Sequence, residues 1–158
     1  MWCKVEIPKK GGSCPVLMGT YQNSIDAKNR LIIPAKFKTE LVEKCVITRG
    51  LDSCLVIFPM KAWEKQQEQF AVLPRTDERA RRFLRYVYGN AVDCDIDKQG
   101  RIVIPQFLKD FAQIEKDLVT IGMIDRVEVW AKDVFDGAEG GGRMSPDDFH
   151  DFGDYFQV

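Results

Sequence analysis

Two short polar segments carry the side chains of this sequence that are best suited to binding chemistry. They are residues 25–34 (IDAKNRLIIP) and residues 96–105 (IDKQGRIVIP), which lie 71 residues apart. Each segment places an Asp four residues before an Arg, with a Lys between them. Because a guanidinium is a planar fork that matches phosphate or guanine, a pair of such turns could straddle a nucleic-acid duplex.

A structural role is equally open for these side chains. Asp26–Arg30 and Asp97–Arg101 could be internal pairs that hold each turn, since an Asp that opens a turn commonly bonds its own backbone. The two roles are compatible, because a paired Asp can orient an Arg that also contacts DNA.

The composition argues against catalytic chemistry. His150 is the single histidine, so one chain cannot build a His-dependent triad or a His-rich metal site. A carboxylate pair of Asp26 and Asp97 is the weaker interpretation of those residues. No glycine loop that could cradle a phosphate is present. We therefore expect no enzyme, no catalytic residue, no metal and no cofactor.

Both polar segments belong to longer repeating halves, each predicted to run strand, turn, strand, helix, strand, strand. Matching turn positions hold Asn29 and Gly100, the residue types that best tolerate a left-handed backbone. After the helix the repeat continues at an offset of 72, where Val46-Ile47-Thr48 answers Leu118-Val119-Thr120. The halves indicate an α+β internal pseudo-dimer. The expected strands are 21–25, 30–33, 46–48, 55–58, 91–96, 101–104, 118–121 and 126–130, and the expected helices are 35–44 and 105–112.

Two further helices are expected between the halves, at 61–72 and 76–88. The second has apolar residues spaced for one amphipathic face. Its other side suits a solvated face with salt bridges, a contact to the DNA backbone, or a subunit contact. The side chains concerned are Arg75, Arg79, Arg81, Arg82 and Arg85.

The net charge of −1 hides a division along the chain. Residues 16–132 carry 19 Lys/Arg and 16 Asp/Glu, whereas residues 133–158 carry one Arg and seven acids. A mildly basic core is weak evidence for nucleic-acid binding, although an oligomer would multiply any basic face. The five cysteines form no C-x-x-C pair, and no apolar run nears the roughly 20 residues of a membrane span. We expect a cytosolic protein in which Cys45, Cys54 and Cys94 are packing residues.

The two ends differ from the middle. Residues 1–17 lack periodicity, and we interpret them as a flexible extension or as a non-native one, with Val16 as the natural start. Residues 137–158 are expected to be a flexible acidic tail that follows a glycine-rich linker. Within it, the run Ser145-Pro146-Asp147-Asp148 predicts the start of a short helix.

The doubled Asp-x-x-x-Arg-apolar-apolar-apolar-Pro block has informative flanks. With Met18-Gly19-Thr20-Tyr21 before it, and Thr120-Ile121-Gly122 and Val129-Trp130 after it, the sequence resembles the MraZ family of bacterial regulators over residues 16–136. The resemblance implies AbrB/SpoVT-like swapped-hairpin units at 18–60 and 90–136, joined by a linking helical pair at 61–89. It also implies a ring-shaped homo-oligomer. Such a ring would bind direct repeats in the promoter of the family's own division and cell-wall gene cluster, usually as a repressor.

The family's turn is close to Asp-x-Lys-Gly-Arg. The first turn keeps both cations, with Asn29 where Gly is usual, so we expect it to carry more of the DNA contact. In the second turn Gln99 stands where Lys is usual, and the cation is displaced to Lys98. By position, the resemblance implies DNA contacts from Lys28, Asn29, Arg30, Lys98, Gln99 and Arg101, in turns oriented by Asp26, Asp97 and Gly100.

The rival interpretation is a ring-forming protein-interaction scaffold without specific DNA binding. A DNA binder should present a basic face and an affinity that falls log-linearly with salt, whereas a scaffold need show neither. The favoured interpretation is a cytoplasmic, nucleoid-associated protein. Its partners would be double-stranded DNA from its own promoter and copies of itself, with no membrane.

Overall fold

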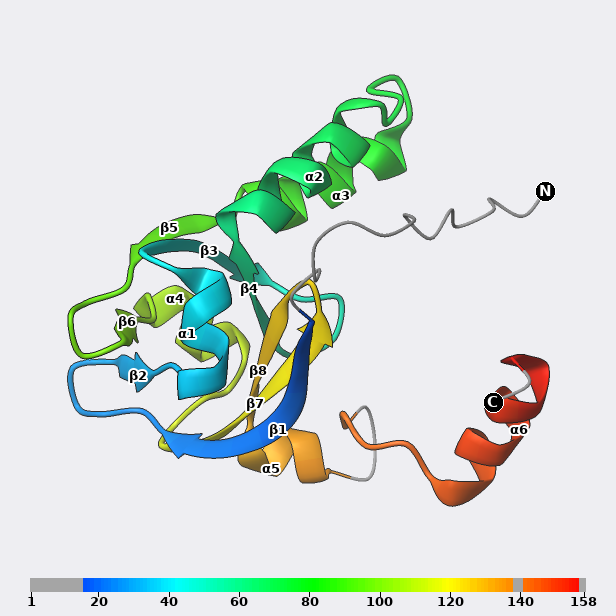
Figure 1. Ribbon diagram of the computed structural model, residues 1–158. Coiled ribbons are helices and arrows are strands. Elements are labelled where there is room, and N and C mark those ends of the chain that lie inside the picture. Colours follow the sequence, from blue (N-terminus) through cyan, green and yellow to red (C-terminus); the bar gives the residue numbers. More distant parts are fainter. Residues whose placement is uncertain (1–15, 138–140, 157–158) are drawn as a thin grey trace, which may run out of the picture.

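The computed structural model describes residues 16–137 and 141–156 (Figure 1). Of residues 1–17, which were interpreted as an extension, residues 1–15 fall outside the described part of the chain, whereas Leu17 is buried and begins the first strand. Within the described part, no helix has the length and apolar character to cross a bilayer. The strands are β1 (Leu17–Ser24), β2 (Arg30–Ile32), β3 (Lys44–Arg49), β4 (Leu55–Pro59), β5 (Val92–Asp95), β6 (Arg101–Val103), β7 (Asp117–Ile124) and β8 (Val127–Ala131). The helices are α1 (Ala35–Leu41), α2 (Met60–Ala71), α3 (Glu78–Tyr88), α4 (Gln106–Phe111), α5 (Lys132–Asp136) and α6 (Pro146–Phe156).

Strands are exchanged between the two halves of the chain. Six of them form one sheet in the order β1-β7-β8-β4-β3-β5, and β2 and β6 form a separate two-stranded ribbon. Strand β1 of the first half pairs antiparallel with β7 of the second, while β5 of the second half pairs with β3 of the first. Each outer strand therefore satisfies its backbone hydrogen bonds in the other half. The predicted α+β pseudo-dimer of β-rich units is confirmed.

Two strand pairings mark the pseudo-twofold axis that relates the halves. Leu31 faces Ile102 in the ribbon, and Val56 faces Glu128 in the large sheet. In both pairs the partners are the corresponding residues of the repeat. The axis therefore passes through the middle of the ribbon, and the turns that precede β2 and β6 are symmetry mates.

The strand register corrects one detail of the predicted repeat. Phe58 pairs with Val46, and its counterpart Trp130 pairs with Val119. Val46 thus corresponds to Val119 and not to Leu118, because the loop before β7 is longer than the loop before β3. The sequence could not reveal this slip, since these strands are buried on both faces and lack the alternation that would set their register.

Apolar side chains fill both faces of the large sheet. The face that looks toward the ribbon packs against α1 and α4, with Phe37 and Leu108 among its fully buried residues. The opposite face has two smaller clusters, one under α2 and α3 around Trp63 and one under α5 around Trp130. Free thiols complete this packing, as predicted, at the buried positions Cys45, Cys54 and Cys94.

Several helix boundaries differ from the predicted ones. Helix α1 ends at Leu41 rather than at residue 44, because Val42 turns to a φ of 54° and Lys44 already pairs in β3. Helix α3 begins later than residue 76, because the side chain of Asp77 caps it. Helix α5 is an addition to the predicted elements.

The short acidic helix forms where it was predicted. Helix α6 begins at Pro146, and the Oγ atom of Ser145 accepts a hydrogen bond from the backbone N–H of Asp148 at 3.1 Å. This bond satisfies one of the donors that a helix leaves open at its N-terminus.

Candidate nucleic-acid interface

The two polar turns share one hydrogen-bonding scheme. In the first, Oδ1 of Asp26 accepts hydrogen bonds from the backbone N–H groups of Lys28 and Arg30, each at 2.9 Å. The other oxygen, Oδ2, accepts from Nε of Arg30 at 2.6 Å. A single carboxylate therefore closes the turn and holds the guanidinium.

The second turn repeats this scheme. Oδ1 of Asp97 accepts from the backbone N–H groups of Gln99 and Arg101, each at 2.9 Å, and Oδ2 accepts from Nε of Arg101 at 2.8 Å. The loss of the usual Lys at Gln99 leaves the geometry unchanged, because residue 99 contributes a backbone N–H to it. The internal Asp–Arg pairs considered from the sequence are thus present in both turns.

A left-handed residue closes each turn, as the sequence predicted. Asn29 has a φ of 58° and Gly100 a φ of 74°. Their backbone N–H groups donate to the carbonyl oxygens of Asp26 and Asp97 at 3.0 and 2.9 Å. Asn and Gly are the residue types that adopt this conformation at least cost.

Each turn is held in place by the opposite half of the chain. The carbonyl oxygen of Asn29 accepts from the backbone N–H of Ile104 at 2.8 Å, and that of Gly100 accepts from Ile33 at 2.9 Å. The turns are therefore fixed to the ends of the ribbon strands and do not project as free loops.

Sequence reasoning missed two lysines that lie beside the turns. Nζ of Lys109 in α4 donates to Oδ1 of Asn29 at 3.1 Å. In the second turn, the end of the Lys38 side chain from α1 lies where a Cβ on Gly100 would be. The two lysines are 71 residues apart and so occupy the same position of the repeat. This recurrence in the sequence could have identified them as candidates.

The electrostatics of the turns leave a positive excess. The backbone N–H groups of Arg30 and Arg101 hold the pKa of Asp26 and Asp97 below the ordinary value of 3.8, so both carboxylates are ionised near neutral pH. Each Asp balances its Arg, while the exposed Lys28 carries no ion pair within the described residues. The same holds for the side chains of Lys38, Lys98 and Lys109.

The arginines stay partly accessible although they are paired. Their side chains are 29% exposed at Arg30 and 25% exposed at Arg101. Among the described residues, each guanidinium makes its hydrogen bond through Nε alone. The two Nη groups of each guanidinium make no hydrogen bond to the described residues, so they can form a bidentate contact with a ligand.

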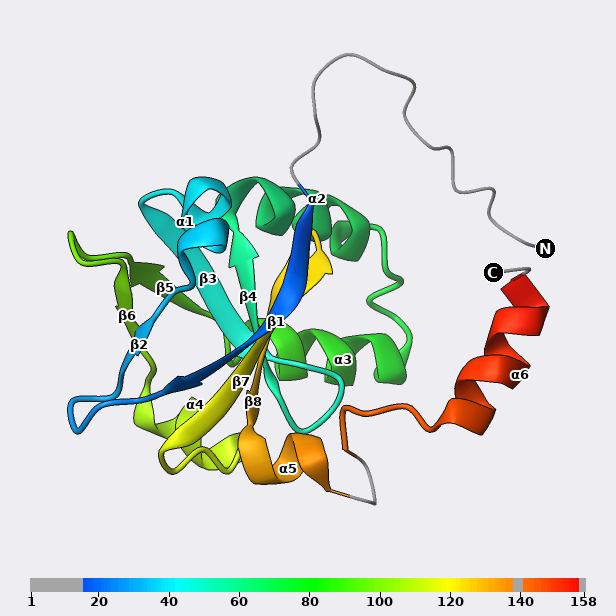
Figure 2. The ribbon, with the colours of Figure 1, turned by 60° about the horizontal axis from the view of Figure 1, so that its bottom comes forward.

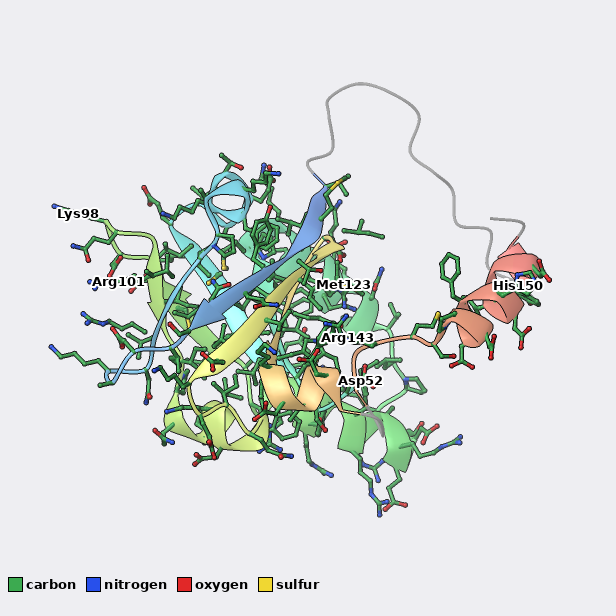
Figure 3. All side chains as sticks on the ribbon, turned by 90° about the horizontal axis from the view of Figure 1, so that it is seen from below. Asp52, Lys98, Arg101, Met123, Arg143 and His150 are labelled. Atoms are coloured by element: carbon green, nitrogen blue, oxygen red, sulfur yellow. The ribbon has the colours of Figure 1, made fainter. Side chains whose placement is uncertain are left out.

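Both turns lie on the same side of the molecule. The β1–β2 and β5–β6 connections project together at the left of Figures 1 and 2. Figure 3 shows Lys98 and Arg101 pointing outward on that side. Six cations thus gather around two turns that the pseudo-twofold axis relates: Lys28, Arg30, Lys38, Lys98, Arg101 and Lys109.

The arginine-rich helix lies elsewhere. Helices α2 and α3 form a hairpin that extends away from the turns (Figure 1). Several of its arginines make local contacts: Nη2 of Arg82 binds Glu78 at 2.6 Å, and Nη1 of Arg81 donates to two carbonyl oxygens just before the helix. These contacts agree with the solvated-face interpretation and separate the α3 arginines from the turns.

Comparison with known proteins matches the chain twice to one family profile, described as "MraZ protein, putative antitoxin-like", over residues 16–86 and 87–140. The chain is 49% identical over 121 residues to the transcriptional regulator MraZ of Caldanaerobacter subterraneus subsp. tengcongensis, covering 77% of this chain and 85% of that protein. It is 50% identical over 121 residues to the transcriptional regulator MraZ of Thermoanaerobacter sp., with the same two coverages of 77% and 85%. With the protein of that name from Clostridium beijerinckii it shares 46% identity over 118 residues, covering 75% and 83%.

Proposed function

This chain belongs to the MraZ family, and from that premise we propose that it is a DNA-binding transcriptional regulator that reads its site with the two Asp-held turns. It is a regulator and not an enzyme. The observation that carries the proposal is the duplicated turn. Two carboxylates in the same bonding scheme each hold an arginine through its Nε, and the Nη groups of both arginines make no hydrogen bond to the described residues.

The division of labour within a turn follows from side-chain chemistry. Nε of Arg30 donates to Asp26, and its Nη groups make no hydrogen bond to the described residues, so they can bind guanine O6 and N7 or a phosphate. Lys28 is a flexible point charge and supplies contact to the phosphate backbone. Arg101 and Lys98 take the same roles in the second turn. Because each Arg is already oriented, less side-chain entropy is lost when DNA binds.

The wider assignment follows the family resemblance and a multivalency argument. We propose a ring-shaped homo-oligomer in the cytoplasm, associated with the nucleoid. It binds direct repeats in the promoter of its own division and cell-wall gene cluster and represses that promoter. A single turn binds DNA weakly, whereas several equivalent turns matched to evenly spaced repeats raise the affinity through effective concentration.

The first test is binding of the purified protein to the DNA just upstream of its own gene, against scrambled DNA, at two salt concentrations. We expect tighter binding to the upstream DNA and an affinity that falls as salt rises. Arg30→Ala should weaken binding by about fivefold to more than a hundredfold, since loss of one Arg–base contact costs about 1–3 kcal/mol.

The matched control is Arg79→Ala. Arg79 is 91% exposed on α3 and pairs with Asp77 at 3.6 Å, so its loss tests the effect of removing a surface charge away from the turns. Equal effects of the two substitutions would contradict the turn as the reader. Equal, weak binding to both DNAs would favour the ring-forming scaffold that binds another protein.

A further inference from the structure

Two exposed aliphatic side chains stand on the outer face of the β2–β6 ribbon. Leu31 and Ile102 point inward and are fully buried, as the central pair of the ribbon should be. Their neighbours Ile32 and Val103 point the other way and are 57% and 56% exposed. The core of the described chain therefore does not require these two side chains to be apolar.

The ribbon places each aliphatic side chain beside a turn arginine. Ile32 is directly opposite Arg101, and Val103 is directly opposite Arg30. Side chains of directly opposed residues have Cβ atoms about 4.5–5.5 Å apart and lie on one face. The outer face thus carries four side chains, two arginines and two aliphatics, in an arrangement that the pseudo-twofold axis repeats.

A side chain of the large sheet fixes the position of the ribbon. Nδ2 of Asn23 in β1 donates to the carbonyl oxygen of Ile32 at 2.9 Å. The ribbon strands also continue directly from the two turns, so the aliphatic side chains move with the arginines as one body. A surface that meets DNA through the turns therefore brings Ile32 and Val103 to it as well.

The major groove of DNA presents chemical groups that match the arginine and aliphatic side chains of this face. It admits a two-stranded β-ribbon, and thymine presents its C5-methyl group there, next to the hydrogen-bonding edges of the neighbouring bases. Guanine presents O6 and N7, which an arginine can bind with both prongs. A ribbon face of alternating Arg and aliphatic side chains is complementary to a guanine with a thymine close by.

We infer that Ile32 and Val103 are specificity-determining residues that contact thymine methyl groups beside the bases read by Arg101 and Arg30. This inference rests on the proposed function and deepens it. The arginines supply hydrogen bonds to base edges, and the aliphatic side chains reject positions where the methyl group is missing. The bound sites should therefore contain guanine and thymine close together in each repeat.

The test compares two versions of the upstream DNA fragment, one made with thymidine and one with deoxyuridine, which lacks the methyl group. Wild-type protein should prefer the thymidine fragment by roughly fourfold for each methyl contact, the effect of burying one such group. The variant Ile32→Ala/Val103→Ala should bind the thymidine fragment more weakly and show little or no preference between the two. Both substitutions are at exposed positions, and thermal unfolding confirms that the variant is folded.

Val72→Ala is the matched control, because Val72 is an exposed aliphatic residue at the end of the α2–α3 hairpin. It should keep the wild-type preference for thymidine. If the ribbon variant kept that preference too, the inference would be overturned, and a changed oligomer size in the same variant would assign the surface to a second copy of the chain. Failure of the wild-type protein to select the upstream DNA at all would instead overturn the proposed function, and the inference with it.

Discussion

Each turn depends on one carboxylate with two tasks. The Oδ1 atom of Asp26 accepts two backbone N–H groups, while its Oδ2 atom holds the guanidinium of Arg30. The structural and orienting roles that the sequence left open are therefore performed by different oxygens of the same side chain. Asp97 repeats the arrangement, so any property of one turn should have a counterpart in the other.

Acid should lower the free energy of unfolding partly by protonating the carboxylates of Asp26 and Asp97. The pKa values of Asp26 and Asp97 are lowered from 3.8 in the folded protein, so the ionised carboxylates stabilise the fold at higher pH. This stabilisation is lost as the pH falls through the lowered pKa values. Between about pH 6 and about pH 3, urea unfolding should show a smaller loss of stability in Asp26→Asn/Asp97→Asn than in the wild-type protein.

The exposed Asp52 lies in the β3–β4 loop, and Asp52→Asn is the control for this experiment. It should follow the wild-type protein across the same pH range. A double variant that lost as much stability in acid as the wild-type protein would show that the two carboxylates do not hold the turns.

The lysine and arginine of a turn should have separable effects on DNA binding. Lys28→Ala removes the proposed phosphate contact, so it should weaken binding to all sequences and lower the slope of log affinity against log salt by about one for each turn that binds. Arg30→Ala should reduce the preference for upstream over scrambled DNA. Fluorescence anisotropy titrations across a salt series measure both quantities, and identical slopes for Lys28→Ala and wild type would argue against the phosphate role.

The turns are precise because other elements hold them. Helix α4 supplies Lys109 to the first turn and helix α1 supplies Lys38 to the second. The backbone of each turn is also bonded to the strand that follows the opposite turn. Because the halves exchange strands, each turn is held in place by residues of both halves.

The left-handed backbone of Gly100 can be tested by substitution. Gly100→Ala should destabilise the protein by about 1–2 kcal/mol, the cost of a left-handed backbone with a Cβ, while the flexible end of Lys38 moves aside. Gly100→Asn should cost less, because Asn29 already adopts a φ of 58° at the matching position. Chemical unfolding of the two variants measures the difference, and equal destabilisation would contradict the backbone explanation.

At the scale of the whole molecule, one chain presents two equivalent turns on one side, where Figure 3 shows Lys98 and Arg101. If both turns bind DNA as proposed, the chain is bivalent before any oligomer forms. The α2–α3 hairpin extends away from that side (Figure 1) and leaves it open for a duplex. This geometry favours a binding mode in which affinity comes from the number of engaged turns.

Affinity should rise more steeply than the number of repeats in the DNA. A fragment with several copies of the proposed direct repeat should bind at least about 100-fold more tightly than a fragment with one copy, because later contacts form within the same complex. Gel-shift titrations of the two fragments measure this ratio, with a several-copy fragment of altered spacing as the control. An affinity that merely followed the number of copies would contradict multivalent binding.

The pattern of the repeat allowed most of the fold and the positions of the two turns to be predicted. The helices, most strand positions and the left-handed residues at Asn29 and Gly100 follow from local signals such as apolar spacing and turn chemistry. The end of α1 at Leu41 and the pairing of Val119 with Trp130 do not. Both depend on loop length and on strands buried on two faces, where local sequence carries no register information.

The sequence by itself determined that this protein has two related halves and two cationic turns of the form Asp-x-x-x-Arg, because these are properties of residue type and spacing. Only the tertiary structure decided which half completes which strand pair, that Lys38 and Lys109 stand beside the turns, and that Ile32 and Val103 share a face with Arg30 and Arg101. The physical reason is that these contacts join residues at least 45 positions apart, as in the pairing of Ile47 with Val92. Such contacts exist only after the halves exchange strands, and no local preference of the chain encodes them.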